Sequence, residues 1–228
     1  MGEWRRHAIY FAPEAGSMLA RFGAAWLGWD ADAGVEPAAV LLPDLPLPRS
    51  ELVAAPRRYG FHATLKPPFR LAEGCAEAAL DGAAAAVAAD FPPFALRLRL
   101  AWLGGFLALV PEQEPPALAA LAEACVTRLD RFRAPPEADE VAQRRAAGLD
   151  AVEAAHLMRW GYPYVLGRFR FHLTLTGPVA AEHRAAVHAG LGKQLTPVLD
   201  APVPVADLCH FGEGGDGRFR VISRHRLG

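Results

Sequence analysis

One pentapeptide occurs twice in this chain with a single letter changed: FHATL at 61–65 and FHLTL at 171–175. Both copies alternate apolar and polar side chains, which is typical of a strand with one buried face. After each copy the sequence predicts a helix, a strand, a Gly-containing turn and another strand, in the same order and at nearly the same spacing. This order indicates an internal duplication.

The duplication predicts an α+β fold with two similar lobes, each an antiparallel sheet with helices on one side, and a cleft between the lobes. We expect residues 1–228 to form a single bilobal domain. The proline pair within 133–137 marks the expected boundary, which gives lobes of about 14–133 and 134–228. The opening RHAIYFAP predicts a strand within 1–13 that cannot be assigned to either lobe.

Further elements follow from periodicity and from turn residues. Ser17 is the expected N-cap of the first helix, and the proline-rich stretch 30–56 is expected to be mostly loop. Helices are expected at 15–29, 73–90, 115–132, 137–159 and 181–195, a strand at 165–179, and hairpins at 94–111 and 203–225.

The alternation places a histidine and a threonine on the same face of each motif strand. In the first copy His62, Thr64 and Lys66 are expected on one face, opposite the apolar Phe61 and Leu65. Arg58 has the same parity as His62.

The second copy repeats this arrangement with one difference. His172, Thr174 and Thr176 are expected on the polar face, and Arg168 has the same parity as His172. Thr176 stands where the first copy has Lys66, so the two lobes are not equivalent.

These residue types suit acid–base chemistry at phosphorus. Histidine has an ordinary pKa of about 6.5, so it can take and give a proton near neutral pH. Two histidines flanking a phosphate would supply a base for the attacking water and an acid for the leaving oxygen. A threonine hydroxyl on the same face can hydrogen-bond a non-bridging oxygen. Acid–base catalysis of this kind needs no metal and no cofactor.

Paired H-x-T-L strands, one in each half of a duplicated α/β chain, resemble the two-histidine phosphoesterase superfamily. The strings RYGFHATLKPPF, RWGYPYVLGRFRFHLTLTG and RHAIYFAP resemble more narrowly the branch associated with bacterial phosphonate-degradation operons. The resemblance spans nearly the whole chain. It implies a cyclic phosphodiesterase in which His62, Thr64, His172 and Thr174 are catalytic.

The resemblance leaves the substrate open between a sugar 1,2-cyclic phosphate and a nucleotide 2′,3′-cyclic phosphate. Which histidine is the acid and which the base stays open as well. The residues that we expect to bind the substrate are Lys66, Tyr10, Tyr59, Arg58, Arg168 and Thr176.

Other interpretations compete with the catalytic one. The histidines could be hydrogen-bonded structural residues, or ligands of a metal, although no Asp, Glu or Cys close to either histidine shares its strand parity. The same cleft would also serve a non-catalytic module that binds nucleotides or cyclic phosphates, or an enzyme that runs the reaction as ligation or phosphotransfer.

Composition limits the partners. The 24 basic and 25 acidic side chains give a net charge of −1, without the basic excess of a polynucleotide-binding surface. We therefore expect a small-molecule cyclic phosphate as the partner, and a monomer. Three scattered cysteines are typical of a cytoplasmic protein, and no apolar run is long enough to predict a membrane span.

Overall fold

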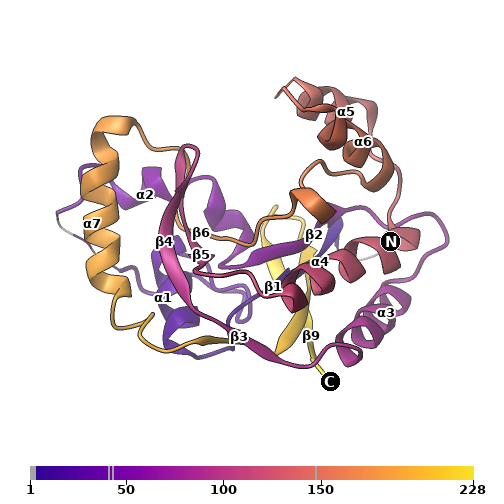
Figure 1. Cartoon of the computed structure of the whole chain (residues 1–228), viewed down its shortest axis with the longest axis horizontal. Helices are drawn as coiled ribbons and strands as arrows, with labels where there is room; N and C mark the ends of the chain where they lie inside the picture. The colour runs from indigo at the N-terminus through magenta and orange to yellow at the C-terminus, as the bar shows by residue number, and fades with distance from the viewer. Residues whose placement is uncertain (1–3, 41, 43, 147) are drawn as a thin grey trace.

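The computed structural model describes residues 4–40, 42, 44–146 and 148–228. It is an α+β fold with antiparallel sheets and flanking helices, as expected from the sequence (Figure 1). None of the helices in this described part combines the length and the apolar character that a bilayer-spanning helix needs.

A four-stranded sheet carries the first motif. Its strands run in the order β2 (Ala63–Phe69), β1 (Arg6–Phe11), β8 (Asp207–Glu213) and β9 (Phe219–Arg226). All the neighbours are antiparallel. The expected hairpin at 203–225 is confirmed as β8 and β9, joined through a glycine-rich turn.

A three-stranded sheet carries the second motif. Its order is β4 (Leu98–Leu103), β5 (Phe106–Pro111) and β6 (Leu173–Thr174), again antiparallel. The hairpin expected at 94–111 is confirmed, with Gly104 at φ 58° in its turn. A two-stranded sheet of β3 (Phe94–Leu96) and β7 (Val203–Val205) links the two larger sheets.

Each large sheet draws strands from both halves of the sequence. The first motif strand, β2, shares a sheet with the late hairpin β8–β9, and the second motif strand, β6, pairs with the early hairpin through β5. The expected lobe ranges 14–133 and 134–228 therefore do not coincide with the two sheets. The order of elements after each motif is as expected, but the hairpins are exchanged between the halves.

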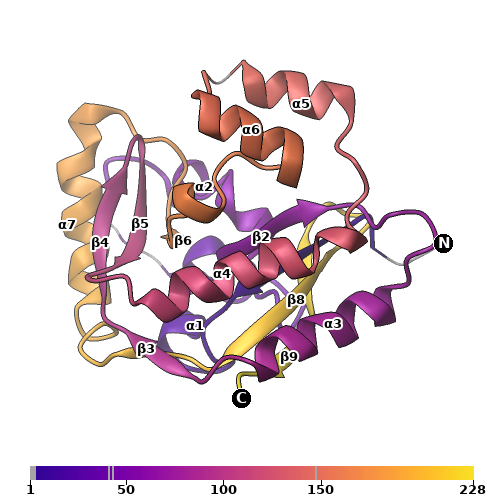
Figure 2. The same cartoon turned by 45° about the vertical axis from the view of Figure 1, so that its right-hand side comes forward.

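Helices cover one face of each sheet. Helices α3 (Glu77–Ala89) and α4 (Pro116–Arg128) pack on the four-stranded sheet (Figure 2). Helix α7 (Arg184–Leu195) approaches β4, and α1 (Met18–Leu27) is tied to the second motif because the Trp26 indole donates to the carbonyl of Leu175 at 2.8 Å. Ser17 caps α1 as expected, since its hydroxyl accepts from the Ala20 amide.

Two expectations about 137–179 are wrong. The single helix expected at 137–159 is a pair, α5 (Ala138–Arg145) and α6 (Ala151–Trp160), because Gly148 at φ 81° breaks the helix and Asp150 caps the next one with Glu153. The strand expected at 165–179 is regular only over β6, after a short 3-10 helix. Figures 1 and 2 both show α5 and α6 standing apart from the sheets.

The remaining elements are short. They connect the larger ones and include the turn that precedes the first motif. Their bounds are α2 (Arg49–Leu52), η1 (Pro56–Tyr59), η2 (Asp130–Phe132), η3 (Leu166–Arg168) and η4 (Ala181–His183).

Candidate active site

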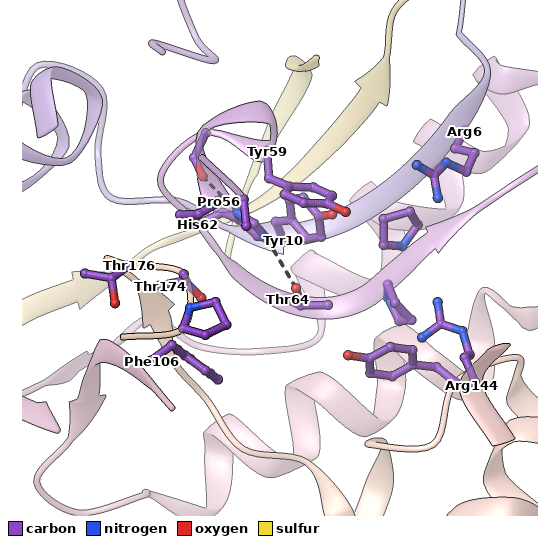
Figure 3. A pocket seen from close by; sticks show the side chains of 17 residues that line it. Arg6, Tyr10, Pro56, Tyr59, His62, Thr64, Phe106, Arg144, Thr174 and Thr176 are labelled. Atoms are coloured by element: carbon purple, nitrogen blue, oxygen red, sulfur yellow. Dashed lines mark hydrogen bonds between the residues drawn. The ribbon is translucent and has the colours of Figure 1, made fainter. Parts of the chain in front are cut away.

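Two adjoining cavities lie at the motif strands. The first has a volume of about 390 Å³ and is lined by His62, Thr64 and Thr174 together with aromatic and basic side chains (Figure 3). The second, of about 380 Å³, is lined by His172. Their linings overlap at Thr64, Pro67, Phe106 and Tyr162. The two motifs thus contribute to one continuous region between the sheets.

The two motif strands have the same pattern of exposure along 61–67 and 171–177. The Phe and Leu positions are buried, whereas the His and Thr positions are half-buried. The expected division into an apolar and a polar face is therefore confirmed for both FHxTL segments. Burial of the apolar face fixes the register, because a shift by one residue would turn every side chain over.

The two imidazoles are held in the same way. His62 Nδ1 lies 3.0 Å from the carbonyl oxygen of Gly60, and His172 Nδ1 lies 2.8 Å from that of Arg170. A carbonyl only accepts, so each Nδ1 carries the hydrogen and the Nε2 of each neutral ring is a hydrogen-bond acceptor. In the first motif Nε2 is 3.3 Å from the Thr64 hydroxyl, which lines both cavities.

A glycine makes the first of these contacts possible. Gly60 follows η1 with φ 73°, a backbone conformation that residues with a side chain rarely adopt. A Cβ at this position would lie 2.7 Å from the Cβ of Ala31. Gly60 therefore sets the direction of the carbonyl that orients His62.

Both histidines are neutral in the unliganded protein at pH 7. Burial lowers the pKa of His62 to about 4, and the neighbouring His172 lowers it further while the Gly60 carbonyl opposes the shift. Burial also lowers the pKa of His172. The influence of His172 on the pKa of His62 places the two rings within electrostatic range of each other.

Aromatic rings flank the histidines. Tyr10 is almost fully buried and stacks on His62, with ring centroids 3.8 Å apart. Tyr59 lies 5.9 Å from His62, and both tyrosines line the first cavity. Phe106 lies 5.6 Å from His172. Tyr10 and Tyr59, which were predicted to bind substrate, are therefore at the site, with Tyr10 holding the imidazole in place.

Lys66 is not at the cavities, so its expected position beside His62 is wrong. Thr64 pairs with Tyr10, but Lys66 pairs with the next residue along β1, Ile9, so the register shifts at Leu65. This bulge turns Lys66 to the opposite face of the strand from Thr64.

The Lys66 side chain is buried instead of facing a ligand. Its Nζ donates to the Val126 carbonyl at 3.1 Å and lies 3.3 Å from Asp130. Burial lowers its pKa to about 8, against the effect of Asp130. These contacts give Lys66 a structural role between β2 and α4.

Of the other residues expected to bind substrate, some line a cavity and one does not. Thr176 lines the first cavity, and its hydroxyl accepts from the Leu107 amide at 3.0 Å. Arg168 lines the second cavity and pairs with Asp150 at 2.6 Å. Arg58 is outside both linings. Its guanidinium stacks on the Tyr59 ring and lies 3.6 Å from Glu213.

The structure adds cavity-lining residues that are not among the predicted site residues. Arg6, Phe106, Arg144 and Tyr162 line the first cavity. Strand alternation does place Arg6 on the face of Tyr10 in RHAIYF, and this signal could have been used. Arg144 lies on a helix whose position over the site depends on tertiary structure, so no local pattern marks it.

The fold and the site define the class: an α+β protein in which two similar His-x-Thr strands meet at adjoining cavities. The chain belongs to the DUF1045 family, described as proteins of unknown function, whose model matches residues 64–220. Relatives named ribose 1,5-bisphosphate phosphokinase PhnN occur in Janthinobacterium sp. (strain Marseille), 45% identical over 174 residues, and in Laribacter hongkongensis (strain HLHK9), 41% identical over 171 residues. Each alignment covers 75% of this chain, and the chain spans only 38% and 40% of those relatives.

Several solved structures are similar over the full chain. E. coli LigT complexed with phosphate is 16% identical with a TM-score of 0.44 and 99% coverage of both chains. LigT complexed with 3′-AMP is 17% identical with a TM-score of 0.43, also at 99% coverage of both. A structure titled as a phosphoesterase is 15% identical with a TM-score of 0.41 and 98% coverage of both.

Proposed function

We propose that this chain is a metal-independent cyclic phosphodiesterase that opens a small cyclic phosphate ester. The observation that carries the proposal is the matched pair His62 and His172. Each imidazole is fixed through Nδ1 by a backbone carbonyl two residues earlier, which leaves Nε2 as the reactive nitrogen. Structural histidines in a core have no need for this repeated arrangement at a cavity.

The chemistry balances with these groups alone. One Nε2 takes a proton from a water molecule as its oxygen bonds to phosphorus, and the other histidine, protonated, gives a proton to the ring oxygen as its P–O bond breaks. The product is a phosphomonoester with a free hydroxyl. Because both histidines are neutral in the empty site, the anionic substrate must raise the pKa of one of them on binding.

The threonine hydroxyls have a complementary role. Thr64 and Thr174 line the first cavity beside His62 and can donate to the non-bridging oxygens, where negative charge is concentrated. The hydroxyl of Thr64 is 3.3 Å from His62 Nε2, a long contact that a phosphate oxygen could replace.

A metal site would need several ligating side chains close to the histidines. Within the described residues, no group of three or more His, Cys, Asp or Glu side chains is placed to hold a metal ion. An assay with and without a chelator tests directly whether turnover needs a metal.

The substrate class is proposed on two grounds. The cavity volumes of about 390 and 380 Å³ suit a small molecule, and the curated relatives are named for a ribose phosphate. We therefore place a sugar 1,2-cyclic phosphate first and a nucleoside 2′,3′-cyclic phosphate second, with phosphonate breakdown as the metabolic setting.

Phosphorus NMR tests the proposal. The wild type, His62→Ala, His172→Ala and a control His188→Ala are each incubated with ribose 1,2-cyclic phosphate and with a nucleoside 2′,3′-cyclic phosphate. His188 is exposed on α7, so its substitution should leave turnover unchanged. Each site variant should lose about 10²–10⁴ in rate while remaining folded. Tight binding of a cyclic phosphate without any turnover by the wild type would instead support the non-catalytic binding module.

A further inference from the structure

The first cavity extends past the histidines to a group of basic and phenolic side chains. Arg6 from β1 and Arg144 from α5 both line it, as do Tyr59 and Tyr162. Figure 3 shows both guanidiniums on the same side of the cavity, away from His62 and Thr174. The catalytic proposal does not use them.

The guanidinium of Arg144 packs on an aromatic ring. It stacks on the Tyr162 ring, 4.8 Å from the centroid, and opposes the rise in the pKa of that phenol that burial causes. Within the part of the chain that the structure describes, no carboxylate forms an ion pair with Arg144. A half-buried guanidinium at a cavity wall has donors available for an anion.

Positive charge also exceeds negative charge around Arg6. Arg6 binds Glu213 through Nε at 2.5 Å and Nη2 at 3.0 Å, so Nη1 is not used in this pair. Arg58 lies 3.6 Å from the same carboxylate. Two guanidiniums therefore share one carboxylate, and with Arg144 this end of the cavity carries a net positive charge.

We infer that this end of the cavity is a second anion subsite, and that the substrate is a cyclic phosphate ester bearing an additional phosphate group. The cyclic phosphate lies at the histidines, and the second phosphate lies between Arg144 and Arg6. The paired N–H groups of an arginine guanidinium match the spacing of two phosphate oxygens, and the phenols of Tyr59 and Tyr162 add hydrogen-bond donors. This inference rests on the proposed cyclic phosphodiesterase, whose substrate class it narrows.

The test compares ribose 1,2-cyclic phosphate with its 5-phosphorylated form, using the wild type, Arg144→Gln and Arg145→Gln. Helix α5 has no buried residues, so both variants should fold. Arg145 is exposed on the same helix and does not line either cavity, which makes it the matched control.

The wild type should prefer the 5-phosphorylated ester by at least about tenfold in kcat/KM, the effect of a charge-assisted pair. Arg144→Gln should lose about tenfold or more with this ester, yet change by less than about twofold with the unphosphorylated one. Arg145→Gln should match the wild type on both. Equal loss on both substrates in Arg144→Gln, or a wild type without preference, would overturn the subsite.

Calorimetric binding of ribose 5-phosphate separates this inference from the proposed function. The wild type should bind it at least about tenfold more tightly than Arg144→Gln, whatever the outcome of the turnover assay. If the wild type opens both cyclic esters but binds ribose 5-phosphate no better than the variant does, the subsite is wrong and the phosphodiesterase stands. If binding differs as expected and neither ester is opened, the phosphodiesterase proposal fails instead.

Discussion

The phenol ring of Tyr10 lies against the imidazole of His62, with centroids 3.8 Å apart and the ring planes 26° from parallel. Tyr10 is nearly fully buried and also contacts Phe211 and Phe219 from β8 and β9. The four-stranded sheet therefore holds one face of the imidazole, while the Gly60 carbonyl fixes its edge. Tyr10 is a positioning residue for His62.

We expect Tyr10→Phe to keep kcat within about threefold, since the stack remains, and Tyr10→Leu to lose roughly 10- to 100-fold, since a misplaced catalytic group costs that much. The measurement is kcat with a cyclic phosphate, together with urea unfolding to confirm that Tyr10→Leu is folded under assay conditions. Similar kcat values for Tyr10→Leu and Tyr10→Phe would show that the stack does not position the histidine.

The lowered histidine pKa values predict an acidic optimum for kcat/KM. Catalysis needs one protonated and one neutral histidine, and this singly protonated form is most abundant between the two pKa values. The pKa of His62 is about 4 and that of His172 is below its ordinary value, so both lie under 6.5. As pH rises above this range the protonated form disappears, and kcat/KM should fall.

Initial rates between pH 4 and 9 check this prediction. The profile of kcat should be displaced to higher pH than that of kcat/KM, because the bound anion raises the pKa of the acid. A kcat/KM value that stays constant up to pH 8 would mean that the acid in the free protein is not one of these two buried histidines.

Lys66 offers a clear test of its structural role. Lys66→Met removes its contacts with Val126 and Asp130, but Asp130 keeps Arg133 at 2.8 Å, so we expect a loss of about 1–3 kcal/mol in the free energy of unfolding. The value of kcat/KM for folded protein should remain within about threefold of the wild type, as expected for a residue outside the cavities.

The same substitution at the exposed Lys193 is the control for Lys66→Met, and it should change neither quantity. Urea unfolding and steady-state kinetics supply the measurements. A loss of tenfold or more in kcat/KM at unchanged stability would return Lys66 to the phosphate-binding role that the sequence indicated.

Local sequence patterns were enough to predict the parts of the site that depend on one strand at a time. The buried Phe and Leu of each motif and the polar face of His62 and His172 follow from period-two alternation. The bulge at Leu65 could not be predicted, because it depends on how β2 meets β1, and it moves Lys66 to the other face.

The sequence also did not predict that the two hairpins are exchanged between the halves. Periodicity gives the order of strands along the chain, but it does not say which strands pair. The sequence therefore predicted correctly that the two motifs lie in antiparallel sheets, but it missed the small sheet of β3 and β7 and assigned the hairpins to the wrong partners. For the same reason Arg144 was not recognised, since only the tertiary structure brings α5 to the cavity.

A hydrogen-bonded chain of buried histidines lies apart from the cavities, between β1, β8 and α3. His7 Nδ1 lies 2.9 Å from His210 Nε2, and His210 Nδ1 lies 3.0 Å from Asp81, which also contacts His225 and Ser223. Since the carboxylate accepts from His210 Nδ1–H, His210 Nε2 accepts from His7 Nδ1–H. This network is satisfied when His7 and His210 are neutral.

Acid should therefore destabilise the fold. Burial, with the nearby His210, lowers the pKa of His7 to about 4, whereas an unfolded histidine titrates near 6.5. Between these values the unfolded chain binds more protons, so the free energy of unfolding falls as pH falls, by up to about 3 kcal/mol from His7 alone. The lowered pKa of His210 acts in the same direction.

Urea unfolding from pH 4.5 to 7.5 measures this dependence. His7→Gln keeps an amide donor for His210 Nε2 but cannot titrate, so its unfolding free energy should decline less steeply below pH 6.5 than that of the wild type. His188→Gln changes an exposed histidine and should keep the wild-type slope. If His7→Gln loses stability with acid as steeply as the wild type, His7 is not a source of the pH dependence, and His210 or the half-buried histidines of the active site would account for it instead.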